Sequence, residues 1–274
     1  DSDEYSRLVL GRHGQATFAV IPRDSIKTED VKKFEFFSYR YSHVDKQRQL
    51  GFREVLKTPT VQEKYMLRSI LAIDTGFTDP TVIQLIGQDA QGIWRTLIRY
   101  RLTRIPFPEQ ADIIDWIDAK YNVNTIAVDL GSGGGGIPLT QDLASTRFAR
   151  SKYYSKKIFG VRFNDMIFTG YDTFGNEMKL MARSYGGQEL ARLAQEHQLI
   201  FSEIDFEGLS QLERVAAQKM TDGSNRYFVL SDKGTGKSSD DHIFAAYIVW
   251  VIALTSLQYK IQRRQLIGAK WLNE

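Results

Sequence analysis

The sequence has no cysteine and only four histidines among its 274 residues. The absence of cysteine excludes disulfide frameworks, thiolate metal sites and cysteine nucleophiles. The histidines show no metal-ligand spacing such as HExxH, so a histidine-based zinc site is not expected. Long apolar runs are also missing, since the longest, Ile243 to Leu254, is shorter than the roughly 18 residues that span a bilayer. We therefore expect no membrane partner.

Neither sign of charge dominates the chain. Lysine and arginine number 36 and aspartate and glutamate 33, and the net charge of +3 is too mild to establish a nucleic-acid partner by itself. The hydrophobic share of 42% and the charged share of 25% are typical of a folded domain and exclude a disordered chain. No charged-then-apolar leader opens the chain, so we expect no export signal. Because it begins with Asp1 rather than methionine, we expect a fragment of a longer protein.

Residues 1–65 have the least distinct pattern. The segments Arg7–Leu10 and Thr17–Ile21 predict a short hairpin. Phe34–Tyr41, which is rich in aromatic residues, predicts a strand or an aromatic plug, and Gln47–Leu56 predicts a short helix. We interpret residues 1–65 as an N-terminal extension or linker that carries no chemistry.

A clear pattern begins near residue 68. Three apolar segments, Ser69–Asp74, Thr81–Gly87 and Ile93–Thr103, are joined by short turns and predict an antiparallel meander. In the third segment, alternation predicts one apolar face and one basic face. The apolar face would carry Trp94, Ile98, Tyr100 and Leu102, and the basic face Arg95, Arg99 and Arg101.

A crossover unit follows the meander. Pro108 predicts a helix start, and an apolar stripe at helical spacing leads to the strand Asn124–Leu130, which we expect to pair in parallel. The remainder predicts helices near 138–149, 186–197 and 208–221, strands near 157–163 and 226–231, a hairpin around 173–176 and a long helix from Asp240. The fold class is α/β, with a mixed sheet flanked by helices. We assign residues 66–262 to this domain and 263–274 to a C-terminal tail.

Acidic residues lie at the ends of three apolar elements. Asp74 ends the first strand, Asp129 ends the strand after the crossover helix, and Asp240-Asp241 open the last helix. Each alone is commonly a turn or cap residue. Together, converging carboxylates would repel one another, and divalent cations would offset the repulsion. Two Mg²⁺ or Mn²⁺ ions about 4 Å apart can activate water and stabilise the leaving oxygen of a phosphodiester. We therefore predict metal-dependent phosphodiester cleavage.

The motifs around these residues resemble those of a known family. Leu71–Thr81 (LAIDTGFTDPT), Thr125–Asp129 (TIAVD) and Ser239–His242 (SDDH) are similar to the acidic motifs of the nuclease domain of large terminases, the DNA-packaging motors of tailed bacteriophages. The resemblance covers about residues 66–258 and implies a ribonuclease-H-like fold. It further implies double-strand cleavage of concatemeric viral DNA during packaging.

The resemblance also assigns roles to the acidic residues. Asp74 would bridge two metal ions, Asp129 would ligate one of them, and Asp241 would complete the site. Many relatives have Asp-Ala where this chain has Ala245-Ala246, so Asp240 remains an alternative ligand. Asp79 could assist a metal, although a turn role before Pro80 is the stronger interpretation.

Partners and location follow from the same resemblance. It implies double-stranded DNA as substrate, an ATPase motor domain, a small terminase subunit and a portal protein as partners, and the cytoplasm of the infected bacterial host as the location. The chain itself shows no nucleotide site. Gly234–Ser238 (GTGKS) lacks the first P-loop glycine, whose position is Ser231, and the glycine run at 131–136 has no acidic partner about 20 residues on.

Basic residues gather in one stretch of the sequence. From Arg147 to Arg162 there is no acidic residue, and aromatic side chains are interleaved with the basic ones. We predict DNA contacts there and in the late basic loop, by Arg150, Lys152, Lys156, Lys157 and Lys233. A solvated helix end with buried aromatics is the competing interpretation.

Three alternatives remain open. A Holliday-junction resolvase of the same fold uses a similar acidic set. A sugar kinase or actin-like ATPase has a DxGxT motif like Asp74–Thr78, but needs two ribonuclease-H-like halves. A non-catalytic DNA-gripping packaging module would have a purely structural acidic cluster.

Overall fold

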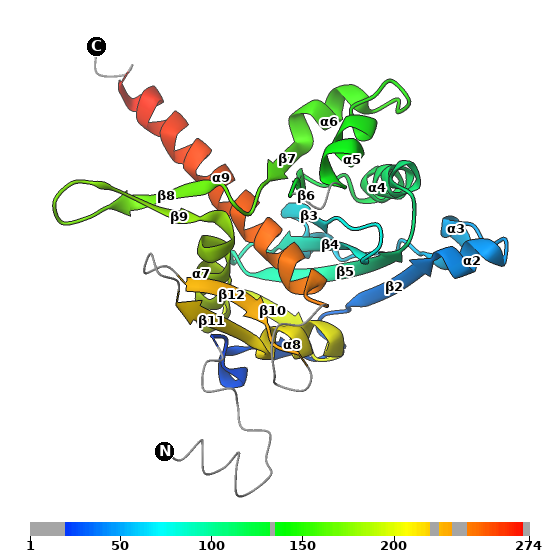
Figure 1. Cartoon of the computed structure of the whole chain (residues 1–274), viewed down its shortest axis with the longest axis horizontal. Coiled ribbons are helices and arrows are strands. Elements are labelled where there is room, and N and C mark those ends of the chain that lie inside the picture. Colours follow the sequence, from blue (N-terminus) through cyan, green and yellow to red (C-terminus); the bar gives the residue numbers. More distant parts are fainter. Residues whose placement is uncertain (1–19, 132–134, 220–224, 232–239, 271–274) are drawn as a thin grey trace, which may run out of the picture.

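The structure, a computed structural model, describes residues 20–131, 135–219, 225–231 and 240–270, with side chains of the last helix described up to Ser256. The hairpin predicted before residue 22 therefore lies almost entirely outside the described residues. A mixed sheet forms the centre of the molecule, and helices cover both of its faces (Figure 1). The predicted fold class is confirmed.

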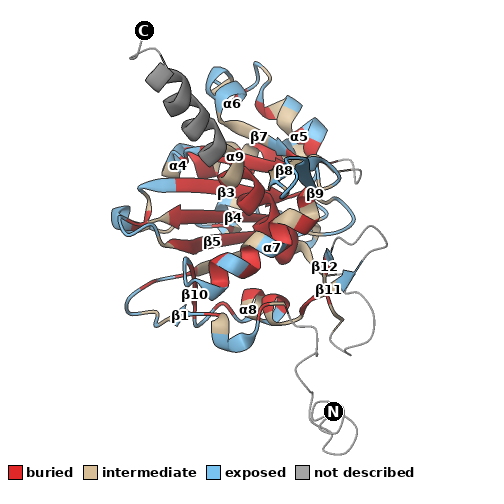
Figure 2. Ribbon diagram, turned by 90° about the vertical axis from the view of Figure 1, so that its left-hand side faces the viewer, coloured by how far each residue is buried: buried red, intermediate tan, exposed pale blue. Residues whose placement is uncertain are grey.

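Within the described residues the sheet has eight strands: seven follow the order β1-β10-β5-β4-β3-β6-β7, and the eighth, β2, also pairs with β5. Strands β3 (Arg68–Asp74), β4 (Thr81–Gln88) and β5 (Trp94–Thr103) form the predicted antiparallel meander. Strands β6 (Thr125–Asp129) and β7 (Ile158–Val161) continue the sheet in parallel with β3. The central strands are buried on both faces (Figure 2), which explains their nearly continuous apolar sequences.

Segments before residue 66 also enter this sheet. The short strand β1 (Thr28–Glu29) pairs with β10 (Leu199–Ser202), and β2 (Phe37–Ser42) pairs with β5, both in parallel. The strand expected at residues 34–41 is thus present, followed by the short helices α2 (His43–Gln47) and α3 (Phe52–Val55). The domain boundary at residue 66 stays a prediction.

Two apolar cores lie on opposite faces of the sheet. Along β3, Ile70 and Ala72 pack into one core, whereas Leu71 and Ile73 pack into the other. The second core is closed by α4 (Phe107–Tyr121), α5 (Gly136–Leu143) and α6 (Ser151–Lys157). The first is closed by α7 (Ala182–Gln195), α8 (Phe206–Glu213) and α9 (His242–Lys270). Within the described residues, none of the helices combines the length and apolarity that a bilayer crossing needs.

The prediction of a single apolar face on β5 was wrong. Trp94 packs against Trp250 of α9 with ring centroids 5.4 Å apart, but Ile98 lies in the α4 core. The register shifts at this point, because Ile86 lies opposite Thr96 while Leu85 lies opposite Ile98. Leu97 is therefore an extra residue in β5, that is, a β-bulge. The side chains of β5 that precede the bulge consequently point to the face opposite to the one that strict alternation predicts.

Arg95 consequently lies apart from Arg99 and Arg101. Arg95 packs over the ring of Tyr65, a member of the α4 core, whereas Arg99 bonds to residues on the α9 side. The predicted continuous basic face does not exist.

Other elements differ from their predictions in extent. The helix expected over 208–221 ends at Glu213, and Val215–Lys219 forms β11, which pairs with β12 (Asn225–Val229). Burial of Val215 and Val229 in the α9 core outweighs the helical preference of Ala216 and Ala217. Helix α6 and strand β10 were not predicted, and α5 is shorter than expected. The predicted hairpin is present as β8 (Met166–Tyr171) and β9 (Glu177–Met181).

A buried ion pair attaches α8 to the sheet. Arg99 Nη2 donates to Asp205 Oδ2 at 2.7 Å, and both side chains are almost completely buried. Asp205 also caps α8, since its Oδ1 accepts a hydrogen bond from Gly208 N at 2.9 Å. Removing one partner of such a pair leaves an uncompensated buried charge.

We predict that Asp205→Ala lowers the free energy of unfolding by about 3–5 kcal/mol because it leaves Arg99 buried without its counter-charge. Urea denaturation followed by circular dichroism measures this change. The exposed Asp24→Ala variant serves as control and should stay within about 0.5 kcal/mol of the wild type. A loss below about 1 kcal/mol for Asp205→Ala would contradict the assignment.

Candidate active site

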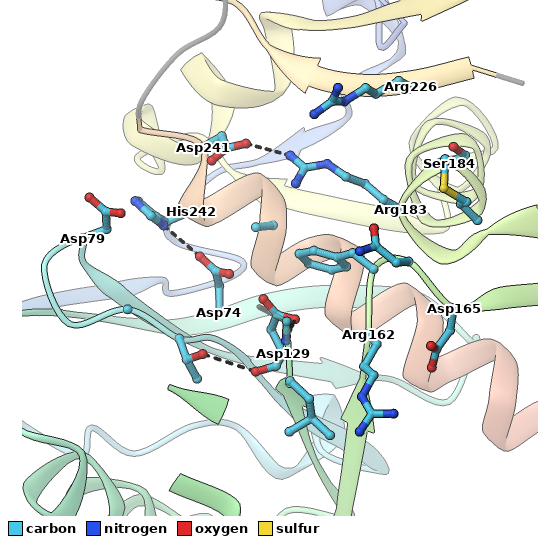
Figure 3. Close-up of a pocket in the computed structure, with 18 of the residues that line it drawn as sticks. Asp74, Asp79, Asp129, Arg162, Asp165, Arg183, Ser184, Arg226, Asp241 and His242 are labelled. Carbon is cyan, nitrogen blue, oxygen red and sulfur yellow. Dashed lines mark hydrogen bonds and ion pairs between the residues drawn. The ribbon is translucent and has the colours of Figure 1, made fainter. Parts of the chain in front are cut away.

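The candidate site lies where two neighbouring parallel strands end. Asp74 is the last residue of β3 and Asp129 the last of β6, and the register pairs Ile73 with Val128 just before them. The sheet therefore places the two carboxylates side by side at its carboxyl edge. They line a cavity of about 780 Å³ into which both side chains point (Figure 3). Its wall also includes Asp79, Arg162, Arg183, Arg226, Asp241 and His242.

The two carboxylates are buried and repel each other. Burial raises the pKa of Asp129 to about 6, with the charge of Asp74 as the second cause. A hydrogen bond of 2.8 Å from Gly131 N to Asp129 Oδ1 partly offsets this rise. Burial also raises the pKa of Asp74, and the neighbouring His242 opposes that shift. Burying two carboxyl groups next to each other destabilises the fold. Their presence therefore favours a functional role at this position over a purely structural one.

His242 is a site residue that the sequence analysis missed. It begins α9, and its Nδ1 lies 2.8 Å from Asp74 Oδ2. Burial would lower the pKa of His242, but the hydrogen bond and the negative charge of Asp74 outweigh it and raise the pKa. Its Nε2 is buried and has no hydrogen-bond partner among the described residues. The one signal in the sequence was its position directly after the acidic pair.

Asp240 and Asp241 have different surroundings. Asp241 lines the cavity and accepts a hydrogen bond of 2.7 Å from Arg183 Nη2. Asp240 is not part of the cavity wall and accepts one of 3.0 Å from Arg101 Nη2. This difference favours Asp241 over Asp240 as a site residue.

Arg183 was not among the predicted residues either. It lies in the first turn of α7, donates from Nε to Tyr227 O at 3.3 Å and packs over the ring of Phe163. Its guanidinium is thus fixed from two sides while it binds Asp241. Figure 3 shows Asp241 directed toward Arg183, whereas His242 is directed toward Asp74.

The donor set suits a hard divalent cation, but the described residues do not form a closed metal site. Among them, no group of three or more histidine, aspartate or glutamate side chains lies in an arrangement that could hold a metal ion. Asp74 and Asp129 supply the carboxylate oxygens that Mg²⁺ or Mn²⁺ prefers. The third carboxylate, Asp241, is paired with Arg183 instead. A cation bound by all three would have to take the place of this ion pair.

The predicted DNA-contacting residues on α6 differ in their surroundings. Arg150 and Lys157 both bind the buried Asp118, at 3.2 Å and 2.8 Å, so they share one carboxylate, which offsets one of their two positive charges. Lys152 and Lys156 are exposed. Lys233 and the predicted basic loop at 234–238 lie outside the described residues.

The glycine run after β6 is described only in part, since residues 132–134 lie outside the described ranges. A Cβ at Gly136 would collide with the backbone oxygen of Asp129. This glycine therefore allows α5 to begin directly against the end of β6, a packing role that needs no dinucleotide.

Comparisons with known proteins agree with this architecture. No family model and no curated protein matches the sequence. Among solved structures, the large terminase nuclease from thermophilic phage G20c with bound cobalt is similar, with a TM-score of 0.51 and 10% identity, over 86% of this chain and 97% of that chain. The same nuclease with bound magnesium gives a TM-score of 0.50 and 12% identity, over the same shares of both chains. At these identities the likeness concerns the fold, and it confirms the predicted resemblance to large terminase nuclease domains.

We predict that Asp129→Asn stabilises the metal-free protein increasingly as pH rises from 4 to 7. The folded state raises the pKa of this carboxyl from 3.8 to about 6, so within that window it retains a proton that the unfolded chain has lost. As pH rises from 4 to 7, the free energy of unfolding of the wild type therefore falls relative to that of the asparagine variant. The total difference is about 2–3 kcal/mol, which corresponds to a pKa shift of two units. Asparagine can still accept the hydrogen bond from Gly131.

Urea denaturation in EDTA at several pH values measures the effect. Asp24→Asn, at an exposed position, is the matched control and should show no such trend. A difference between Asp129→Asn and the wild type that stays constant from pH 4 to 7 would rule out the raised pKa.

Proposed function

We propose that the chain is a metal-dependent endonuclease that cleaves concatemeric double-stranded viral DNA during genome packaging. The observation that carries the proposal is the pair Asp74 and Asp129, buried side by side at the ends of parallel strands and facing an open cavity. The similarity in fold to a phage terminase nuclease, solved with bound cobalt and with bound magnesium, supports it. Double-stranded DNA is the proposed substrate.

The carboxylates would act as metal ligands. Asp74 would bridge two Mg²⁺ or Mn²⁺ ions, Asp129 would ligate one of them, and Asp241 would complete the set after release from Arg183. When bound, the ions would supply an activated water and stabilise the leaving oxygen of the phosphodiester. With a pKa of about 6, Asp129 is mostly ionised at neutral pH and ready to accept a cation.

His242 would position Asp74. The contact from His242 Nδ1 involves Asp74 Oδ2 alone, so the other carboxylate oxygen, Oδ1, is not used by it. An outer partner of this kind fixes the orientation of a ligating carboxylate.

The biological setting is part of the same proposal. We place the chain in the cytoplasm of an infected bacterial host, working with an ATPase motor domain, a small terminase subunit and a portal protein. Exposed Lys152 and Lys156 remain proposed DNA contacts, and so does Lys233. Arg150 and Lys157 would contribute less, because both are already bound to Asp118, which offsets one of their two charges.

A DNA-gripping module without catalysis is the second candidate. The ion pair between Asp241 and Arg183 favours it, since a structural cluster needs only such internal neutralisation. Cleavage assays separate the two candidates. A junction resolvase would be recognised by a preference for four-way junctions over linear duplex.

We predict that the purified chain nicks and linearises plasmid in Mg²⁺ or Mn²⁺. Asp74→Asn, Asp129→Asn and Asp241→Ala should each reduce the rate by about 100-fold or more, since losing only an outer partner of a metal ligand already costs roughly 10–100-fold. Asp240→Ala should retain cleavage, because Asp240 lies outside the cavity wall. Gel analysis of plasmid topology gives the rates. An intact plasmid with every metal would favour the gripping module, and equal cleavage by all the variants would show that the cutting does not depend on this acidic site.

We also predict that Mn²⁺ raises the melting temperature of the wild type in proportion to the logarithm of its concentration, since a ligand that binds only the folded state stabilises it. The double variant Asp74→Asn/Asp129→Asn should show no such rise. Differential scanning fluorimetry needs no catalysis, so it tests the site even if the isolated chain cuts slowly. A metal response that persists in the double variant would assign the ion to another site.

A further inference from the structure

Three arginines from distant parts of the sequence line the cavity that holds the carboxylates. Arg162 follows β7, Arg183 lies in the first turn of α7, and Arg226 belongs to β12. Arg162 ends the basic stretch in which the sequence predicted DNA contacts, although it was not among the residues singled out, and Arg183 and Arg226 were not predicted. The cavity therefore presents acidic side chains where β3 and β6 end, whereas the wall formed by β7, α7 and β12 carries these arginines together with Asp165, which follows Arg162 in the same loop.

Arg162 and Arg226 differ from Arg183 in their partners. Both are exposed, and neither guanidinium makes a hydrogen bond or ion pair with any described residue. Arg183, in contrast, is bound to Asp241 and Tyr227. The two exposed arginines thus remain available to a ligand that enters the cavity.

Their placement fits an extended anionic ligand. In Figure 3, Arg226 and Arg162 lie toward opposite ends of the cavity, and the carboxylates of Asp74 and Asp129 lie at a level between them. A nucleic-acid strand that crosses the cavity would pass one arginine before the carboxylates and the other after them. Guanidinium groups suit this role because they bind phosphate oxygens bidentately and stay charged at any working pH.

The hairpin of β8 and β9 is a weaker surface for phosphate. It carries two acidic residues, Asp172 and Glu177, and one lysine, Lys179, which is paired with Glu177. Its tip presents the exposed aromatic Phe174 instead of a cation. On α6, Lys152 and Lys156 are exposed, and neither has a carboxylate partner among the described residues. The third lysine of this helix, Lys157, is paired with Asp118.

We propose that Arg162 and Arg226 bind two phosphates of one DNA strand, one on each side of the phosphodiester that lies at Asp74 and Asp129. The inference rests on the proposed function and adds the residues that set the path of the substrate strand. Arg162 and Arg226 would be binding residues, and Arg183 would remain the partner of Asp241.

The test measures duplex affinity as a function of salt, in EDTA so that no strand is cut. Each phosphate contact contributes about 0.9 to the slope of log K against log salt concentration. We expect Arg162→Gln and Arg226→Gln each to reduce the slope by about that amount, and the double variant by about twice as much. Fluorescence anisotropy of a labelled linear duplex between low and moderate NaCl gives the slopes.

Two controls make the result specific. Arg48→Gln removes the same charge at an exposed position in the turn after α2 and should leave the slope unchanged. Arg162→Lys and Arg226→Lys keep the charge and should restore most of the slope, which a folding defect would not allow.

The outcomes separate this inference from the proposed function. If wild-type chain cuts plasmid with metal but the glutamine variants keep the wild-type slope, while Lys152→Gln/Lys156→Gln lowers it, the substrate path is wrong and the nuclease proposal stands. If the wild type neither binds duplex nor cuts plasmid, both proposals fail. A lowered slope in the two arginine variants, with normal melting temperatures, supports the path.

Discussion

The repulsion between two buried carboxylates is the constraint on which the rest of this site depends. Asp74 and Asp129 end adjacent strands, and burial together with their mutual charge raises the pKa of Asp129 to about 6. A fold keeps such a pair only where something else compensates it. Here the compensation is incomplete: His242 binds Asp74, whereas among the described residues the Asp129 carboxylate receives one backbone hydrogen bond, from Gly131, and is favoured by the charge of Arg183. The remaining negative charge faces a cavity, where a cation would be stabilised.

The sheet supplies the rigidity that this arrangement requires. Strand β6 reaches its place beside β3 through the crossover helix α4, and apolar cores on both faces prevent either strand from slipping. Helix α9 then brings Asp241 and His242 to the same edge from the far end of the sequence. Residues separated by more than 160 positions thus share one cavity, and their relative geometry is set by backbone pairing and core packing.

The elements that depend on local sequence patterns could be predicted from the sequence. The apolar runs of β3, β4 and β6 and the stripe of α4 each predict their element, and the acidic residues at strand ends predict where the cavity lies. What could not be predicted depends on contacts between distant residues. The bulge at Leu97 arises from the pairing of β5 with β4, and β11 forms because β12 lies beside it. The ion pairs of Asp241 with Arg183 and of Asp118 with Lys157 likewise join elements whose proximity no local pattern reveals.

Strand β5 is flanked on its outer side by two short segments from distant parts of the chain. Residues 199–200 of β10 cover its beginning, and β2 covers Ile98 to Thr103. A polypeptide shortened to start at residue 66 would lose β2 and leave that half of β5 with open backbone donors and acceptors. Uncovered edges of this kind recruit strands from other molecules, so trimming the chain there would favour self-association and precipitation. Strand β2 therefore protects the edge of β5, the strand that carries Arg99 and Arg101, from pairing with other molecules.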